Sequence, residues 1–308
     1  AYKREQKMQV ERRATKAFQH LLQEANVLVT GDGEEAIFQA LQAPPPVLID
    51  GDDPNTPLFL RPESFANYPF PARHLIDIHS YHYEIEGVPA SALISQLGCP
   101  FMCSFCGGRL SPSFRRARLR STDHLLAEIR ELYECYGYRG LNFFDDELNV
   151  NKNLVTDMLA FVYLQEQMKV EFRCRGFIKS ELFTDAQADA LYQAGFRKLL
   201  IGFESGDPRI LQNIQKKATV EDNTRCMDIA HRHGLQVKAL MSVGHAGETE
   251  ESIIATHDWL LKVCPDDFDC TVITTYPSTP YYDFAEPDKS RKGVWVYTAK
   301  GGDRLYSR

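Results

Sequence analysis

The feature that most limits how this chain can fold is a regular alternation of short apolar segments and longer helical segments. The apolar segments cover residues 88–95, 141–144, 170–175, 198–203, 236–243 and 270–275. Helical patterns fill the intervals, at 123–136, 154–168, 186–194, 208–214, 220–233 and 250–263. Consecutive parallel strands need a crossover connection, which is usually a helix and almost always right-handed. We therefore predict an α/β fold in which six parallel strands form a curved, partly open (βα)6 barrel.

Three cysteines follow the first of these strands. Cys99, Cys103 and Cys106 have the spacing C-x3-C-x2-C, and Phe105 directly precedes the third of them. Thiolate ligands select zinc, copper(I) or iron-sulfur clusters. A zinc site would need a second pair of ligands further along the chain, and no such pair follows. A four-iron cluster normally takes four cysteines, so three local cysteines would leave one iron open to another ligand.

This motif resembles the signature of the radical SAM superfamily. The resemblance implies that Cys99, Cys103 and Cys106 hold a [4Fe-4S] cluster and that Phe105 packs against the adenine of S-adenosylmethionine (SAM). In that family SAM binds the open iron, and the reduced cluster cleaves it to a 5'-deoxyadenosyl radical that abstracts hydrogen from a substrate. The radical chemistry then belongs to the cofactor, and the protein positions it. The same resemblance implies a TIM-like radical SAM barrel.

The ends of the later strands carry residues that match further positions of this family. In barrels the chemistry gathers at the C-terminal ends of the strands. The resemblance implies that the cofactor is bound by Asp146, Glu147, Arg175 (with Arg173 as the alternative), Glu204, Ser205 and Gly244. The acids after the second strand have an alternative interpretation as a helix N-terminal cap. The turn that begins at Gly244 is similar to that of the cobalamin-type branch, with Ala246 where proline is usual.

The N-terminal residues resemble the tail of the cobalamin-binding domain that precedes many radical SAM barrels. The similarity rests on residues 25–35, where an apolar strand runs into a Gly-Asp-Gly-Glu turn. We expect a helix, a strand and a second helix of a Rossmann-like α/β domain at 3–24, 27–29 and 34–41. Cobalamin binding and a purely structural extension are both open at this point.

We divide the chain into four parts. Residues 1–42 are the remnant of the cobalamin-binding-like domain, 43–87 a proline-rich linker, 88–285 the radical SAM core and 286–308 a C-terminal extension. Eight prolines between residues 44 and 71 exclude long regular elements from the linker. In the extension, residues 294–298 are rich in β-branched and aromatic side chains and predict one more strand.

Composition narrows the choice of partners and compartment. A net charge of −7 argues against general nucleic-acid binding. The basic stretch 115–120 is either a solvated rim or a contact for an anionic substrate or a carboxylate. The other five cysteines are scattered, as reduced core residues are. No apolar run reaches the roughly 18 residues of a membrane helix, and the first residues are no secretory signal, so we expect a cytoplasmic protein without membrane partners.

Our first functional hypothesis is a radical SAM enzyme of the cobalamin-binding branch, which includes C-methyltransferases. Such an enzyme needs a small-molecule or peptide substrate and an electron donor such as flavodoxin or ferredoxin. One alternative is a radical SAM enzyme of the tRNA methylthiotransferase type, although its additional cysteines and RNA-binding module are not visible in this sequence. The other is a non-catalytic iron-sulfur electron carrier, which would have no use for the residues at the strand ends.

Overall fold

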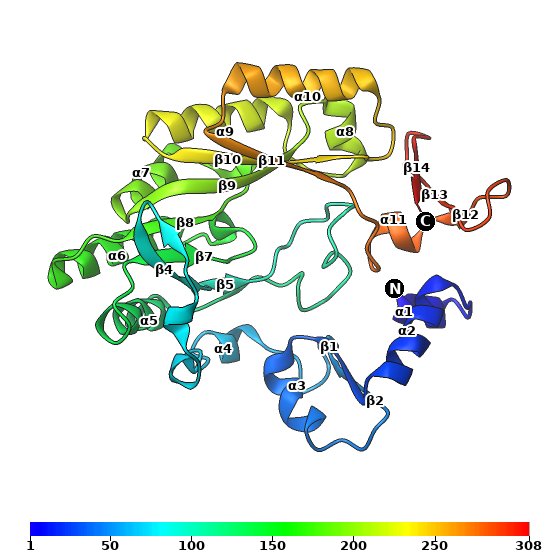
Figure 1. The fold of residues 1–308 in the computed structure, drawn as a ribbon, viewed down its shortest axis with the longest axis horizontal. Coiled ribbons are helices and arrows are strands. Elements are labelled where there is room, and N and C mark those ends of the chain that lie inside the picture. Colours follow the sequence, from blue (N-terminus) through cyan, green and yellow to red (C-terminus); the bar gives the residue numbers. More distant parts are fainter. Residues whose placement is uncertain (308) are drawn as a thin grey trace.

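A computed structural model describes residues 1–307 and has a curved seven-stranded sheet at its centre (Figure 1). The strand order is β11-β10-β9-β8-β7-β4-β3. The strands are β3 (Glu84–Ile85), β4 (Val88–Leu93), β7 (Gly140–Phe143), β8 (Arg173–Phe177), β9 (Phe196–Glu204), β10 (Gln236–Val243) and β11 (Asp267–Val272). All neighbours are parallel except β3 and β4. The predicted six-stranded parallel half-barrel is confirmed.

Helices cover the convex face of this sheet (Figure 1). They are α5 (Thr122–Glu134), α6 (Leu154–Met168), α7 (Asp185–Gln193), α8 (Pro208–Asn213), α9 (Val220–Arg232) and α10 (Glu250–Val263). Leu141 and Phe143 of β7 belong to the main core between sheet and helices. Because side chains alternate along a strand, Asn142 points to the concave face. Within residues 1–307, no helix has both the length and the apolar character that a bilayer crossing requires.

Most helices and strands lie close to their predicted positions, and α6, β10 and α10 have the predicted bounds. Two strands are shifted. β8 begins at Arg173 instead of 170, because the Phe172 N–H donates to the side chain of Gln165 in α6 at 3.0 Å and holds the preceding residues outside the sheet. β11 begins at Asp267 instead of 270, because it is a largely exposed edge strand whose extent apolar burial does not mark.

The N-terminal residues form a smaller α/β unit. The single helix predicted at 3–24 is wrong, since the structure has α1 (Tyr2–Lys7) and α2 (Arg13–Glu24). The break occurs because the Glu5 carboxylate accepts hydrogen bonds from the N–H groups of Ala14 and Thr15, at 3.1 and 2.8 Å. The first turn of α2 is therefore satisfied by α1. The unit continues with β1 (Val27–Gly31), α3 (Gly33–Ala40) and β2 (Val47–Gly51), in which β1 and β2 pair in parallel.

The strand β2 lies inside the proline-rich stretch 43–87. It can form there because no proline occurs between Val47 and Gly51. The rest of the stretch contains only α4 (Pro62–Phe65), two single turns of 3-10 helix and β3, in line with the expectation that long elements are excluded. The domain boundaries themselves stay a prediction.

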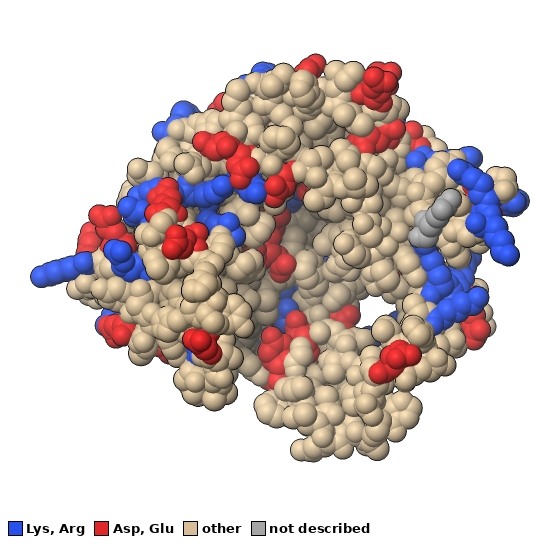
Figure 2. Space-filling model, viewed as in Figure 1, with Lys and Arg blue, Asp and Glu red and all other residues tan. Residues whose placement is uncertain are grey.

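The C-terminal segment forms a separate antiparallel sheet of β12 (Glu286–Pro287), β13 (Trp295–Thr298) and β14 (Arg304–Ser307). The strand predicted at 294–298 is thereby confirmed. The N-terminal helices dock beside this segment, where the Arg13 guanidinium lies 4.6 Å from the ring centroid of Trp295 in β13. Both termini and many Lys and Arg side chains gather on this side of the molecule (Figures 1 and 2).

Candidate functional site

The three cysteines lie on a loop that follows the C-terminal end of β4. Two short strands, β5 (Gln96–Leu97) and β6 (Arg118–Leu119), pair antiparallel and close the loop at its base. Cys99, Cys103 and Cys106 are all half-buried. Burial raises the pKa of Cys99 to about 12 and also raises the pKa of Cys106, and the nearby Cys103 thiol adds to both shifts. The loop therefore gathers three thiols at the mouth of the half-barrel.

The start of this loop has room only for glycine. Gly98 has a φ of +91°, and a Cβ at this position would lie 2.3 Å from the carbonyl oxygen of Arg116. The next N–H, that of Cys99, donates to the Phe114 carbonyl at 2.8 Å. The two sides of the loop approach so closely that the position of Cys99 depends on Gly98.

The acids that follow β7 support this loop. Asp146 accepts a hydrogen bond from the Gly98 N–H at 2.7 Å. Asp145 accepts from the N–H and the hydroxyl of Ser95, at 3.0 and 2.6 Å, and from the N–H of Gln96. Burial raises the pKa of Asp145 to about 7. The two aspartates thus bind the chain that leads from β4 into the loop, and neither of them caps the short helix that follows.

The opposite side of the loop is held by residues that follow β9. The Ser104 N–H donates to the carbonyl of Ile214, just after α8, at 2.7 Å. Arg109 Nη2 donates to Gln215 Oε1 at 2.7 Å. The cysteine loop is therefore fixed from both sides, by the residues that follow β7 and by those that follow α8.

A chain of buried polar side chains lies beside the loop. Lys216 Nζ is 3.0 Å from Glu204 Oε1, and the Ser242 hydroxyl donates to Glu204 Oε2 at 2.7 Å. His245 Nε2 is 2.8 Å from the Ser242 hydroxyl, and its Nδ1 is 3.1 Å from the Tyr281 hydroxyl. We call these five residues the Glu204 network.

The Glu204 network carries one ion pair and one neutral imidazole. Burial alone would raise the pKa of Glu204, but the Lys216 charge and the Ser242 hydrogen bond outweigh it and lower that pKa. Burial would lower the pKa of Lys216, but Glu204 raises it. Burial lowers the pKa of His245 to about 4. The ring of Phe105 lies 5.5 Å from the imidazole, so the network borders the cysteine loop.

Glu147 and Lys179 add two more charged groups next to the cysteines. Burial raises the pKa of Glu147 to about 7, against the opposing charges of Lys216 and Lys179. The charges of Glu147 and Lys179 in turn shift the pKa of Cys99 in opposite directions. Lys179 is buried, and its ammonium lies 4.4 Å from the ring centroid of Phe101 in the loop.

Arg175 does not lie where the sequence analysis expects it. The strand β8 continues to Phe177, so Arg175 is in the middle of the strand and not at its end. Its Nε donates to Asn142 Oδ1 at 2.9 Å, and its guanidinium lies 4.7 Å from the ring centroid of Tyr83. The basic residue that the end of β8 brings to the cysteine loop is Lys179.

Ser205 also lies away from the site. Its hydroxyl is 3.0 Å from Thr256 Oγ1 in α10 and accepts a hydrogen bond from the Asp207 N–H at 3.1 Å. Gly244 has a φ of +91° and directly precedes His245. The structure brings together Cys99, Cys103, Cys106, Phe105, Asp146, Glu147 and Glu204 and leaves out Arg175 and Ser205.

Sequence reasoning missed Lys179, Lys216 and Ser242. The only signal for Lys216 was a cation three residues after the end of α8, and for Ser242 a hydroxyl inside the apolar strand β10. Neither signal names a partner. The partners become visible only where the ends of β8, β9 and β10 meet.

The N-terminal unit contacts the segment that follows the cysteines. Asp32 pairs with Arg118, which is almost fully buried. Asp52 accepts hydrogen bonds from the Ser111 hydroxyl at 2.7 Å and from the N–H and hydroxyl of Ser113, at 2.9 and 2.7 Å. Contact with a carboxylate is therefore the correct alternative for Arg118 in the basic stretch. Acidic side chains line the hollow between the barrel and this unit (Figure 2).

The donor set fits a cluster of several irons. Among residues 1–307, no three His, Cys, Asp or Glu side chains converge as the ligands of a single metal ion would. In a four-iron cluster, each iron that the protein holds is instead bound by one cysteine thiolate. Three half-buried thiols spread along one loop, with two buried lysines beside them, meet that requirement.

Comparison with known proteins gives one family and several distant relatives. The family model described as "Radical SAM superfamily" matches residues 93–260. An uncharacterized methyltransferase of Pyrococcus horikoshii is 27% identical over 234 residues, which cover 76% of this chain and 49% of that protein. The bacteriochlorophyllide d C-12(1)-methyltransferase of Chlorobaculum tepidum is 24% identical over 66% of this chain and 44% of its own. This chain thus spans about half the length of these relatives.

A solved structure has the same fold over most of the chain. It is the radical S-adenosylmethionine methyltransferase TsrM from Kitasatospora setae, with cobalamin and a [4Fe-4S] cluster bound. It aligns with a TM-score of 0.60 at 19% sequence identity, over 70% of this chain and 43% of that chain.

Proposed function

The chain belongs to the radical SAM superfamily, and from this we propose that it is the catalytic part of a cobalamin-dependent radical SAM methyltransferase. The observation that carries the proposal is the cysteine loop at the end of β4, with three free thiols beside a buried Glu–Lys pair. An electron carrier would not need that pair. The relatives named as methyltransferases support the same choice of reaction.

In this proposal Cys99, Cys103 and Cys106 hold the [4Fe-4S] cluster. When bound there, the cluster and SAM supply a one-electron reductive cleavage of a carbon–sulfur bond. The chain's own contribution is electrostatic and steric. Lys179 is coupled to Cys99 and Lys216 to Cys103, and each lysine is also paired with a carboxylate, Glu181 at 3.1 Å and Glu204 at 3.0 Å.

The geometry supports some of the predicted SAM contacts more than others. Glu147 lies next to Cys99 and is suited to accept a cationic amino group, whereas the two carboxylate oxygens of Glu204 already bind Lys216 and Ser242. Phe105 presents an aromatic face at the same place. Asp146 acts through Gly98 as a positioning residue for the loop. Arg175 and Ser205 would have to change partners before they could touch the cofactor.

Cobalamin binding belongs to the proposal for the whole protein. It is supported by the cobalamin bound in the TsrM structure and by the strand-turn-helix of β1 and α3, which lies against the cysteine segment through Asp32. A small-molecule or peptide substrate and an electron donor such as flavodoxin or ferredoxin complete the proposed system.

The test is cleavage of SAM by anaerobically reconstituted, reduced protein, followed as release of 5'-deoxyadenosine or of S-adenosylhomocysteine. We expect Cys103→Ala to lose the cluster's visible absorption and all cleavage. Cys135→Ala is the matched control, because Cys135 is exposed, contrary to its expected place in the core, and lies at the end of α5. Full cluster content without any cleavage of SAM would refute the proposal.

A further inference from the structure

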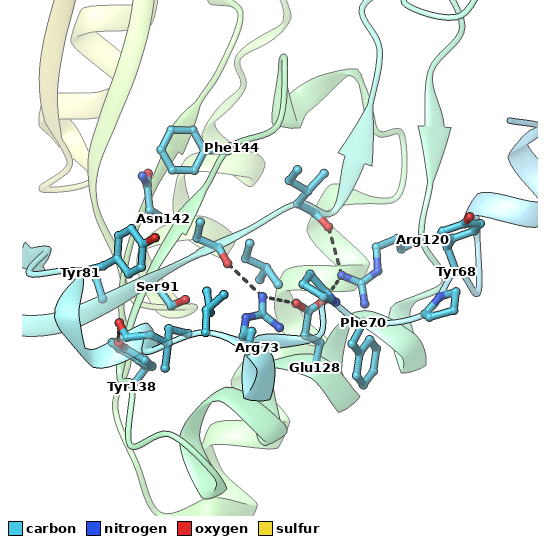
Figure 3. A pocket seen from close by; sticks show the side chains of 18 of the residues that line it. Tyr68, Phe70, Arg73, Tyr81, Ser91, Arg120, Glu128, Tyr138, Asn142 and Phe144 are labelled. Atoms are coloured by element: carbon cyan, nitrogen blue, oxygen red, sulfur yellow. Dashed lines mark hydrogen bonds and ion pairs between the residues drawn. The ribbon is translucent and has the colours of Figure 1, made fainter. Parts of the chain in front are cut away.

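A cavity of about 880 Å³ runs along the free edge of β4, on the side where the half-barrel stays open (Figure 3). Within residues 1–307 the strand β3 pairs only with Val88 and Pro89, so Ser91 to Leu93 have no strand partner on that side. The segment from Phe65 to Tyr83 faces this edge and closes the cavity. The volume falls within the range of about 300–1,000 Å³ that small-molecule sites have.

The walls of this cavity are mostly apolar and aromatic. Figure 3 shows the rings of Phe70, Tyr81, Tyr138 and Phe144 around it, while β4 crosses its middle. Such walls favour a ligand with a flat or extended apolar body, since a strongly hydrated molecule would lose its water without compensation.

One charged cluster interrupts the apolar wall. Glu128 of α5 pairs with both Arg73 and Arg120, so two guanidinium groups share one carboxylate. Arg73 is 7% exposed, and its Nη2 donates to the Ala92 carbonyl at 3.2 Å. Its Nη1 is buried and has no hydrogen-bond partner within the described residues 1–307. A buried guanidinium N–H requires an acceptor, and the excess positive charge makes an anionic acceptor the favourable one.

The other carboxylate on the cavity wall does not neutralise Arg73. Glu34 belongs to α3 of the N-terminal unit, and together with burial and Glu35 it raises the pKa of Tyr68. Glu34 therefore lies near Tyr68. In Figure 3, Tyr68 and Arg73 are on opposite sides of Arg120. A ligand that reaches Arg73 would meet one unpaired donor, on a guanidinium that shares its carboxylate with Arg120.

The cavity also reaches the cysteine loop. Ile94 and Phe144, which directly follow β4 and β7, line it together with Leu97, two positions before Cys99. We propose that this cavity binds the substrate and that the substrate is an apolar acid, whose carboxylate accepts a hydrogen bond from Arg73 Nη1. The apolar body lies along β4 and directs its far end to the mouth of the barrel. Only the identification of this ligand as the substrate rests on the proposed function.

The inference is tested by binding of cis-parinaric acid, a fluorescent apolar carboxylic acid, to the cluster-loaded protein. Dodecanoate and dodecan-1-ol serve as displacing ligands of equal chain length that differ only in the acid group. If Arg73 donates a charge-assisted hydrogen bond to the carboxylate, dodecanoate should displace cis-parinaric acid at a concentration about tenfold lower than dodecan-1-ol does. Equal displacement by the two would overturn the assignment of Arg73.

Three variants locate the binding. Arg73→Gln is expected to abolish the preference for the acid and to leave displacement by dodecan-1-ol unchanged. Arg130→Gln is the matched control, because Arg130 is an exposed residue of the same helix α5 as Glu128 and does not line the cavity. Ser91→Phe fills the cavity from β4 and is expected to prevent binding of the probe. Circular dichroism verifies that each variant is folded.

The outcomes separate this inference from the proposed function. Cleavage of SAM by the wild-type protein without any binding of the probe refutes the inference alone. Binding of the probe with the acid preference, in a cluster-loaded protein that does not cleave SAM, supports the cavity and refutes the proposed function. Unchanged probe binding in Ser91→Phe would place the ligand elsewhere and overturn the inference, even if Arg73→Gln fails to fold.

Discussion

Replacing Gly98 by alanine is expected to prevent assembly of the cluster while leaving the barrel folded. The new Cβ would lie 2.3 Å from the Arg116 carbonyl oxygen and 2.8 Å from that of Phe114, which are both backbone atoms that cannot rotate away. A left-handed conformation at a residue other than glycine costs roughly 1–2 kcal/mol. Loss of the Cys99 hydrogen bond to Phe114 adds about 1 kcal/mol, so β5 and β6 should separate locally.

The measurement is iron and sulfide content after anaerobic reconstitution, together with thermal unfolding. Gly137→Ala is a control for backbone strain without a steric clash, because Gly137 has a φ of +74° but a Cβ there meets nothing within 4 Å. Gly107→Ala is a second control within the loop, since its Cβ would only touch Tyr276 at 4.0 Å. We expect both controls to bind a full cluster. If Gly98→Ala also does so, the argument that this close approach positions Cys99 is wrong.

Three other predictions concern the surrounding side chains. Lys216→Met should lower the free energy of unfolding by about 3 kcal/mol in a urea titration, because Glu204 would be left buried without its counter-ion; the exposed neighbour Lys217→Met is the control. Between pH 6.5 and 4 the unfolded chain binds a proton that the buried imidazole of His245, with a pKa of about 4, does not accept. The free energy of unfolding should therefore decrease as the pH is lowered from 6.5 to 4, and it should decrease less steeply in His245→Gln. Ser205→Ala should cost about 1 kcal/mol of stability without changing the Kd of SAM, and a strong loss of SAM affinity would restore Ser205 as a cofactor contact.

The strands and helices of the barrel could be predicted because their burial is regular. Parallel strands covered by helices show as apolar runs, and the helices α6 and α10 have their predicted bounds. The prediction was less accurate where burial is weak or a single contact decides. The exposed strand β11 is shifted, and the break between α1 and α2 depends on hydrogen bonds to one carboxylate, Glu5.

The site divides in the same way. The spacing of Cys99, Cys103 and Cys106 is local, so the cysteine loop could be recognised from the sequence. Arg175 was expected at the mouth because the end of β8 was placed two residues too early, at 175 instead of Phe177. Because each residue advances a strand by about 3.3 Å, Arg175 lies two residues below the end of β8 and not at the mouth of the barrel.

The sequence by itself determined the barrel and the three-thiol loop, because both depend on periodicity and spacing between residues close in the chain. Only the tertiary structure decided which side chains surround that loop. The pairing of Glu204 with Ser242 depends on the ends of β9 and β10 meeting, and its pairing with Lys216 depends on how the chain returns after α8. The cavity at Arg73 exists because β3 covers only the start of β4. Long-range partners are set by strand register and chain path, which leave no local pattern in the sequence.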